Sequence, residues 1–208
     1  MTEHELIHLS HAWDRVMVTN DCPTRNASRH VTAPMYSIRP GRPEDVPYLP
    51  AVERAAALLF RTYPDLGIPE GLYDQPTSIE TLAAAQKAGR LWIASDSSGN
   101  VVGFALVVVI DGCAHLDELD VLPSVGRQGI GSALVSAVCQ WAADAGYPAV
   151  TLRTFRDVAW NRPFYERMGF QIVDNNSLPS GLRELEEEER REGLPTDTRV
   201  TMLRHSGT

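Results

Sequence analysis

The sequence predicts one folded domain of the α/β or α+β class, built around a mixed β-sheet. The chain has 208 residues, of which 43% are hydrophobic and 22% charged, an ordinary size and composition for one globular domain. Along the chain, hydrophobic residues recur now with the spacing of strands and now with that of helices. The resulting order of elements fits neither a doubly wound parallel sheet nor an all-β sandwich, which leaves a mixed sheet.

The individual elements follow from local patterns. Apolar runs bounded by turn residues predict strands at residues 35–39, 91–95, 101–110, 115–123, 148–155, 169–174 and 198–204. Helical spacing and end signals predict helices at residues 42–60, 78–89, 129–146 and 159–170. The helix from residue 78 has both signals, because Ser78 suits its first position and Gly89 follows its last.

The domain is expected to begin near Met35. Residues 1–34 have scattered apolar side chains and a polar, turn-forming second half, so we expect a poorly ordered extension followed by a domain at 35–208. Histidines of the extension would share one helical face, but no carboxylate or cysteine group completes a ligand set, and no metal site is expected. These histidines are His4, His8 and His11.

Charge and cysteine content exclude several classes of protein. The net charge of -8 disfavours a nucleic-acid-binding role, which needs basic surface. The longest apolar run, residues 101–110, is too short to cross a bilayer, and a single lysine, Lys87, leaves no polybasic membrane anchor. The 3 cysteines have no metal spacing and indicate no disulfide framework, and the N-terminus has no secretory pattern, so a reducing cytoplasm is expected.

A glycine-rich segment before the predicted helix 129–146 points to an anion site. Gly126, Gly129 and Gly131 lie just before and within the first turn, although glycine disfavours helices by about 1 kcal/mol relative to alanine. Bare amides at a helix N-terminus, with Arg127 beside them, suit a diphosphate. The spacing matches neither a P-loop nor the dinucleotide fingerprint, and a tight strand-to-helix turn is the alternative interpretation.

This segment, together with FYERMGF at residues 164–170, resembles the GNAT N-acetyltransferase superfamily. The family motif Gln/Arg-x-x-Gly-x-Gly/Ala follows a strand ending Val-x-Pro, which Val121, Pro123, Gly129 and Gly131 match. The first motif position holds Gly126 instead of Gln or Arg.

The resemblance covers roughly residues 36–204. It implies a mostly antiparallel sheet of six to seven strands, splayed at its centre and flanked by about four helices. It also implies acetyl-CoA as co-substrate, with the pantetheine arm on the strand before the loop and the diphosphate on the loop amides. The implied cofactor-binding residues are Leu119, Asp120, Val121, Gly126, Arg127, Gln128, Gly129, Ile130, Gly131, Ser132, Asn161 and Phe164.

In that family, a tyrosine at the position of Tyr165 acts as general acid toward the departing thiolate. The alternative for Tyr165 is a packed aromatic residue beside Phe164 and Phe170. Asn161 precedes Pro163 and fits the N-cap of the last helix, so its contact with CoA is the weaker interpretation.

The general base is expected on the strand 115–123. Relatives carry Glu or His at positions matching His115 and Asp117, and an unperturbed histidine titrates near pH 6.5. Strand alternation predicts that both residues share a face with Leu119 and Val121. A β-bulge would re-aim them, and polar side chains at a wet strand end are the alternative.

The acceptor is expected to contact the loop 62–76 and the start of the last helix. The candidate substrate-binding residues are Tyr63, Asp65, Tyr73 and Trp160. Aromatic faces and carboxylates suit a cationic amine, while solvated loop residues are the alternative. A charged insertion near 183–192 has Glu and Arg at i, i+4 spacing, which predicts a solvated surface helix first and a lid second.

The sequence therefore predicts an N-acetyltransferase that acts by direct transfer to a primary amine of a small molecule. A protein N-terminus or lysine as acceptor, and a non-catalytic acetyl-CoA-binding module, are the alternatives. Neither Cys113 nor Cys139 has a flanking base in sequence, so no acyl-enzyme is expected. Neither a nucleic-acid nor a membrane partner is expected, and a homodimer is left open.

Overall fold

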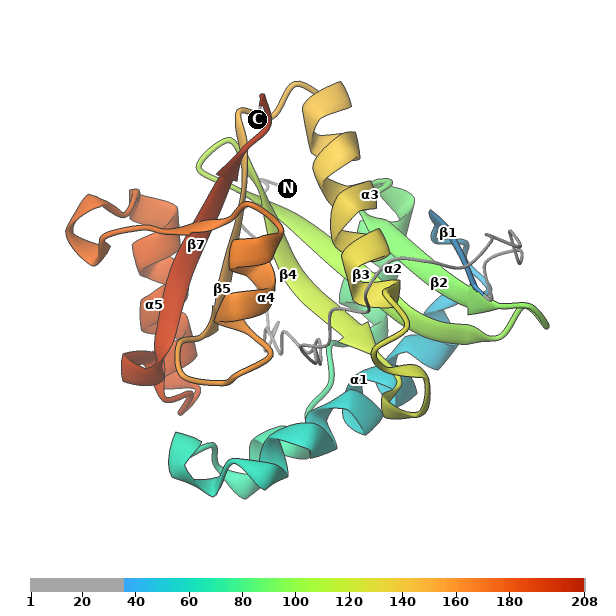
Figure 1. The fold of residues 1–208 in the computed structure, drawn as a ribbon, viewed down its shortest axis with the longest axis horizontal. Coiled ribbons are helices and arrows are strands. Elements are labelled where there is room, and N and C mark those ends of the chain that lie inside the picture. Colours follow the sequence, from blue (N-terminus) through green and yellow to red (C-terminus); the bar gives the residue numbers. More distant parts are fainter. Residues whose placement is uncertain (1–35, 208) are drawn as a thin grey trace, which may run out of the picture.

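The computed structural model describes residues 36–207, which form a mixed sheet with helices on both faces (Figure 1). The predicted extension at 1–34 lies outside the described residues. The strands are β1 (Tyr36–Pro40), β2 (Leu91–Asp96), β3 (Val101–Ile110), β4 (Cys113–Val121), β5 (Ala149–Phe155), β6 (Gln171–Ile172) and β7 (Arg199–His205). The α-helices are α1 (Leu49–Ala57), α2 (Ile79–Lys87), α3 (Ile130–Asp144), α4 (Arg162–Arg167) and α5 (Ser180–Arg191).

Short 3-10 helices occupy many of the connections. They are η2 (Val46–Tyr48), η3 (Leu58–Thr62), η4 (Pro64–Leu66), η5 (Glu70–Asp74), η6 (Pro123–Val125), η7 (Asn175–Ser177) and η8 (Thr196–Thr198). The predicted helix 42–60 is therefore split into η2, α1 and η3. Pro47 and Pro50 explain its late start, because proline cannot donate the backbone hydrogen bond that a helix interior requires.

The sheet has the strand order β1-β2-β3-β4-β5-β7-β6. Every neighbouring pair is antiparallel except β4 and β5, which run parallel. The prediction of a mixed, mostly antiparallel sheet of six to seven strands is confirmed. A parallel pair needs a long crossover connection, and α3 provides it between β4 and β5.

Helices α3 and α4 cover one face of the sheet. Leu134, Val135 and Val138 of α3 are fully buried against Leu119 of β4 in the largest core cluster. Burial of each such side chain contributes roughly 1.5–3 kcal/mol. This face thus fixes the long helix, and with it the glycine segment at its N-terminus.

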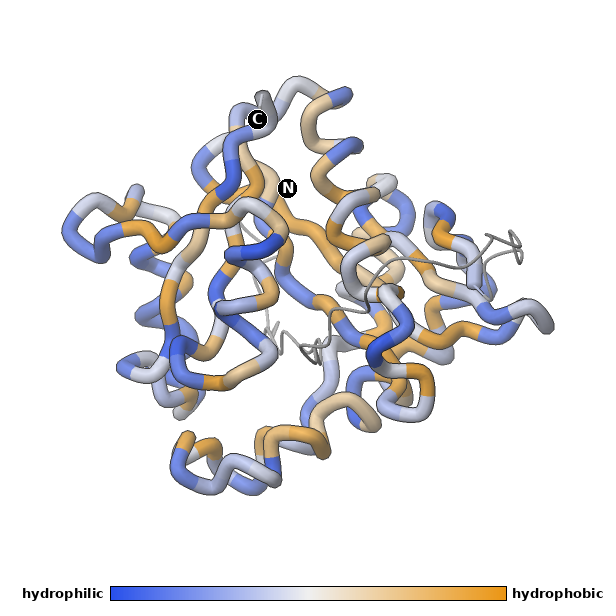
Figure 2. The backbone as a smooth tube through the Cα atoms, in the orientation of Figure 1, coloured by the Kyte–Doolittle hydropathy of each residue, from blue (hydrophilic) through white to orange (hydrophobic). Residues whose placement is uncertain are grey.

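Helices α1, α2 and α5 cover the opposite face. Leu49 of α1 and Leu82 of α2 pack against Phe104 and Leu106 of β3. The predicted start of α2 is confirmed, because the Ser78 hydroxyl accepts a hydrogen bond from the backbone N–H of Thr81 at 3.1 Å. The central strands are mostly hydrophobic in Figure 2, while α5 at the outside is mostly hydrophilic.

Helix α5 forms the charged insertion and is more than a solvated surface helix. Leu182 and Leu185 pack with Ile110 of β3, and Glu189 is 2% exposed. The predicted pair of Glu186 and Arg190 is present at 3.1 Å. The interpretation as a solvated helix is wrong for the inner face of α5. The i, i+4 charge pattern that predicted it describes only the outer face of the helix.

Candidate active site

The sheet opens between β4 and β5. The two strands pair only at Ala114, His115 and Leu116 of β4, where Leu116 meets Leu152. Beyond this point the remainder of β4 stays paired with β3, as Leu119 with Ala105 and Val121 with Gly103. Among residues 36–207, β5 pairs with β4 no further than Leu116, and the β5-facing edge of the later residues of β4 suits an extended ligand.

A β-bulge at Asp117 redirects the side chains at this opening. On β3, Leu106 pairs with Glu118 and Val107 pairs with Leu116, which leaves Asp117 as an extra residue. The expectation that His115 shares a face with Leu119 and Val121 is wrong, because the extra residue inverts the alternation.

Cross-strand partners identify the two faces after the bulge. Glu118 and Asp120 pair with Leu106 and Phe104, which belong to the core under α1 and α2. His115 pairs with Val108, which faces the same side. His115, Glu118 and Asp120 thus lie on the α1 face, while Leu119 and Val121 lie on the α3 face.

The N-terminus of α3 lies just past the end of β4 and is not capped by a side chain of the described residues (Figure 1). Gly129 occupies the N-cap position in the left-handed conformation, with φ 82°. The first turn contains no acidic residue. The amide groups and the positive end of the helix dipole therefore suit an anion.

Local geometry explains part of the glycine pattern. Gly129 is needed for its positive φ, and a Cβ there would lie 3.3 Å from the Tyr36 hydroxyl. Gly131 is buried within α3, and Arg127 itself has a positive φ of 65°. Arg127 and Gln128 are exposed, so the loop is accessible from solvent.

Tyr165 is almost fully buried on α4. Its ring contacts Phe164 edge to face, with centroids 4.9 Å apart, and contacts Phe170 at 5.7 Å. All three rings belong to the core cluster that contains Leu119 of β4. This packing fixes the ring beside the opened strand, and the general-acid role of Tyr165 stays a prediction.

Asn161 does not behave as the expected N-cap. It stands at the N-cap position of α4 with φ -94° and ψ -92°, but its side chain makes no capping hydrogen bond. Asn161 is fully buried, and neither Oδ1 nor Nδ2 has a hydrogen-bond partner within residues 36–207. Because buried amides rarely lack partners, this side chain is suited to contact a ligand.

His115 is a buried, neutral histidine. Its Nδ1 lies 2.8 Å from the Thr151 hydroxyl, and burial, with smaller effects of Arg153 and Arg199, lowers its pKa to about 3. The expected titration near pH 6.5 is therefore corrected. A ring with this pKa is a weak base at neutral pH.

Two buried arginines line the α1 face of β5 and β7. Arg153 Nε donates to Glu189 Oε2 at 2.9 Å, and Arg199 Nε lies 3.3 Å from the same oxygen. Arg153 also donates to Thr201 Oγ1 at 2.9 Å. Helix α5 thus neutralises this cluster and fixes the two arginines that depress the pKa of His115.

Three of the predicted acceptor residues meet in one aromatic cluster. Tyr63 contacts Trp160 edge to face at 4.6 Å, and Phe60 joins both this pair and Phe155 of β5. Tyr73 belongs to the same cluster, beneath the guanidinium of Arg61. The fourth predicted residue, Asp65, is exposed on η4.

Sequence reasoning did not select Glu118 or Arg153 as site residues. Charged residues within a predicted strand, as in residues 115–120, are a signal for such a site, since burying a charge costs free energy unless the charge is paired or hydrogen-bonded.

Among the described residues, no group of His, Cys, Asp and Glu side chains could hold a metal ion. Within the same range, no helix is long and apolar enough to span a membrane.

The opening of the sheet lies beside a helix N-terminus that no side chain of the described residues caps, an arrangement that suits a long anionic ligand. Residues 53–170 match the acetyltransferase (GNAT) family. The chain belongs to this family, and it is an acyltransferase. The fold is also that of solved structures, some of which contain coenzyme A.

Three solved structures illustrate the similarity of the fold. PaiA N-acetyltransferase from Thermoplasma acidophilum, in complex with coenzyme A, has a TM-score of 0.61 at 18% identity, with 82% of this chain and 98% of that chain covered. Ribosomal-protein-S18-alanine N-acetyltransferase from Escherichia coli has a TM-score of 0.54 at 21% identity, covering 81% and 92%.

The third is N-acetylglutamate synthase from Neisseria gonorrhoeae, complexed with coenzyme A and N-acetyl-glutamate. Its TM-score is 0.59 at 20% identity, and the match covers 82% of this chain. The chain spans only 35% of the length of that synthase.

Proposed function

We propose that this protein transfers the acetyl group of acetyl-CoA directly to the primary amine of a small molecule. The observation that carries the proposal is the end of the β4–β5 pairing at Leu116, next to the N-terminus of α3, which no side chain of the described residues caps. An extended chain of amides and a diphosphate are the two parts of coenzyme A that such a site suits.

The proposed binding mode assigns each part of acetyl-CoA to backbone or side-chain groups. The pantetheine arm pairs with the β5-facing edge of β4 at residues 119–121, and the diphosphate lies on the amides of residues 126–132. Arg127 adds a positive charge at the exposed loop. Asn161, whose buried amide lacks a partner among the described residues, and Phe164 contact the arm from α4.

The proposed reaction is an attack of the neutral amine on the thioester carbon. The new C–N bond forms as the carbonyl becomes an oxyanion, and the C–S bond then breaks. Tyr165 donates its hydroxyl proton to the departing thiolate, and the proton lost by the amine restores the tyrosine through solvent and a base. The acetyl group never leaves the site as free acetate.

We assign the base to a carboxylate of β4 instead of His115, because the low pKa of His115 leaves it little affinity for a proton. Glu118 is fully buried on the α1 face, just past the bulge. Asp117 stays a candidate at the bulge itself. The Tyr63 and Trp160 pair supplies an aromatic surface for a cationic acceptor.

Direct transfer is favoured over an acyl-cysteine. Burial, and to a smaller extent Asp111, raises the pKa of Cys113, and burial also raises the pKa of Cys139. A thiol with a raised pKa supplies little thiolate, which is the nucleophilic form. The cytoplasmic location and the homodimer remain predictions.

The test is the release of free coenzyme A from acetyl-CoA with a panel of amines, proteins and peptides. We expect thiol release with small primary amines, and Glu118→Gln is expected to lower turnover by roughly 10²–10⁴. Glu184→Gln, on the exposed side of α5, is the matched control and should leave the rate unchanged.

The outcomes separate the three interpretations. Release only with protein or peptide acceptors would replace the small-molecule assignment by a protein acetyltransferase. Binding of acetyl-CoA without release for any amine would support a binding module and contradict catalysis. A normal rate in Glu118→Gln would remove that residue from the mechanism.

A further inference from the structure

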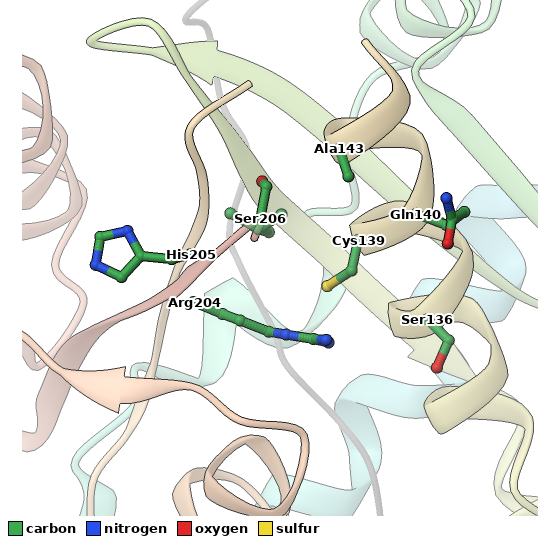
Figure 3. A pocket seen from close by; sticks show the side chains of 8 residues that line it. Ser136, Cys139, Gln140, Ala143, Arg204, His205 and Ser206 are labelled. Carbon is green, nitrogen blue, oxygen red and sulfur yellow. The ribbon is translucent and has the colours of Figure 1, made fainter. Parts of the chain in front are cut away.

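A cavity lies between the C-terminal half of α3 and the end of β7. Its volume is about 250 Å³. It is lined by Ser136, Cys139, Gln140, Ala143, Val150, Arg204, His205 and Ser206 (Figure 3).

This cavity is separate from the proposed acetyl-CoA site. Cys139 lies ten residues after Gly129, which is about 15 Å along the helix axis. Val150, which also lines the cavity, belongs to the part of β5 that is still paired with β4. A ligand here would therefore not occupy the opening of the sheet.

The cavity is lined by one side chain that is always positively charged, Arg204. Figure 3 shows the Arg204 side chain extending from β7 toward α3, with the Cys139 thiol directed toward it, while His205 points away. Arg204 hydrogen-bonds to Cys139. None of the lining residues carries a carboxylate.

Two serine hydroxyl groups also line the cavity. Ser206 Oγ is buried and has no hydrogen-bond partner within the described range, although its backbone N–H is bonded to Pro148. Ser136 is exposed at the rim of the cavity. A guanidinium with neighbouring hydroxyls is the group that proteins use for carboxylates and phosphates.

The size of the cavity limits the ligand. A volume of about 250 Å³ corresponds to about eight water molecules, taking roughly 30 Å³ for each. Inorganic phosphate or a small carboxylic acid fits this space, and a whole coenzyme does not. We propose that this cavity is a second binding site, for a small oxyanion, with Arg204 as its central contact.

Cys139 provides a direct readout, because it lines the cavity. In the full-length wild-type protein, alkylation of each cysteine by iodoacetamide is followed by peptide mass spectrometry. The probes are inorganic phosphate and malate, each compared with sodium chloride at equal ionic strength, with coenzyme A present at saturation. Cys113, at the start of β4 and outside the cavity, is the internal control.

We expect one or both oxyanions to slow alkylation of Cys139 at least fivefold, with the rate at Cys113 unchanged. Protection by phosphate alone identifies a phosphate site, and protection by malate alone identifies a carboxylate site. Protection that persists with coenzyme A bound separates this site from the active site, whatever the catalytic outcome. Equal rates with both probes and with chloride would overturn the proposal.

Two variants test the role of the cation. Arg204→Gln should abolish the protection, while Arg183→Gln, on the exposed surface of α5, should retain it. Ser136→Glu places a carboxylate at the exposed rim and should also abolish the protection, which keeps the test valid if Arg204→Gln does not fold. Undiminished protection in Ser136→Glu and in a folded Arg204→Gln would contradict the assignment.

Discussion

His115 illustrates how a single buried side chain changes the interpretation of the site. The sequence allows a histidine that titrates near pH 6.5, whereas its surroundings lower the pKa to about 3. Burial is the largest cause, followed by the positive charges of Arg153 and then Arg199. The residue therefore acts on the stability of the fold more than on the proton balance of catalysis.

The low pKa of His115 predicts a loss of stability in acid. The unfolded state binds the proton near the ordinary histidine pKa of 6.5, so the full stability is present above that pH and falls as the pH drops toward about 3. His115→Gln removes this titration. Between pH 4 and 6, urea unfolding of the wild type should lose up to about 1.4 kcal/mol more per pH unit than the variant. Equal slopes would contradict the buried neutral ring.

Tyr165 yields a catalytic prediction at the same scale. Tyr165→Phe keeps the edge-to-face contacts with Phe164 and Phe170 and removes only the hydroxyl. Turnover should fall by roughly 10²–10⁴, while the affinity for acetyl-CoA stays the same. Tyr147→Phe, in the same core cluster but near the C-terminus of α3, is the matched control. A normal rate in Tyr165→Phe would leave Tyr165 with its packing role alone.

The wrong predictions for the faces of β4 and for Asn161 have a common physical origin. Asp117 is an extra residue in β4, so the residues after it lie on the opposite face from the one that simple alternation predicts relative to His115, yet nothing in a strand pattern marks such a bulge. Asn161 has a good N-cap sequence, but its ψ of -92° departs from a normal N-cap, and its side chain turns inward. Both features depend on tertiary packing, which local sequence does not record.

At the scale of elements, α5 depends on a cap that comes from a distant turn. The Asp111 carboxylate accepts hydrogen bonds from the backbone N–H groups of Gly181 and Leu182, both at 3.1 Å. A Cβ at Gly181 would lie 2.8 Å from Ile110, so glycine permits this close approach. The hairpin between β3 and β4 thereby anchors the helix that holds Arg153 and Arg199.

Asp111→Asn tests this anchor. Asparagine tolerates the positive φ of 50° at this position, but its amide group presents a donor to one of the two N–H groups. The free energy of unfolding should fall by about 1–2 kcal/mol. Asp197→Asn, at an exposed position of η8, is the control, and its free energy of unfolding should change by no more than about 0.5 kcal/mol. An unchanged stability in Asp111→Asn would show that α5 docks through its leucines alone.

The elements with strong periodic signals could be predicted from sequence, including α3 and the hairpin of β2 and β3. Their apolar spacing and bounding glycines act locally, so the pattern is sufficient. The inner face of α5 could not be predicted, because Leu182 and Leu185 are separated by charged residues, and the buried Glu189 pairs with Arg153 and Arg199 on distant strands.

For the whole molecule, the opening of the sheet is the feature that links fold and function. A splayed pair of strands was expected only through the resemblance to the GNAT superfamily, since no local pattern sets where β4 and β5 separate. The structure ends their pairing at Leu116 and Leu152, beside the N-terminus of α3. The proposed assignment of the base then depends on which face of β4 each side chain occupies.

The most direct test of the central proposal is isothermal titration calorimetry of coenzyme A with wild type, Gly129→Ala and Gly146→Ala. Gly129 and Gly146 flank the two ends of α3 with the same φ of 82°, so alanine introduces the same φ strain at both, and only at Gly129 does its Cβ also meet a neighbour, the Tyr36 hydroxyl at 3.3 Å. We predict binding of one coenzyme A per chain, unaffected in Gly146→Ala and weakened at least about tenfold in Gly129→Ala, a loss of about 1.4 kcal/mol. No heat of binding in the wild type, or equal affinities in the two variants, would contradict the assignment of the anion site to this helix N-terminus.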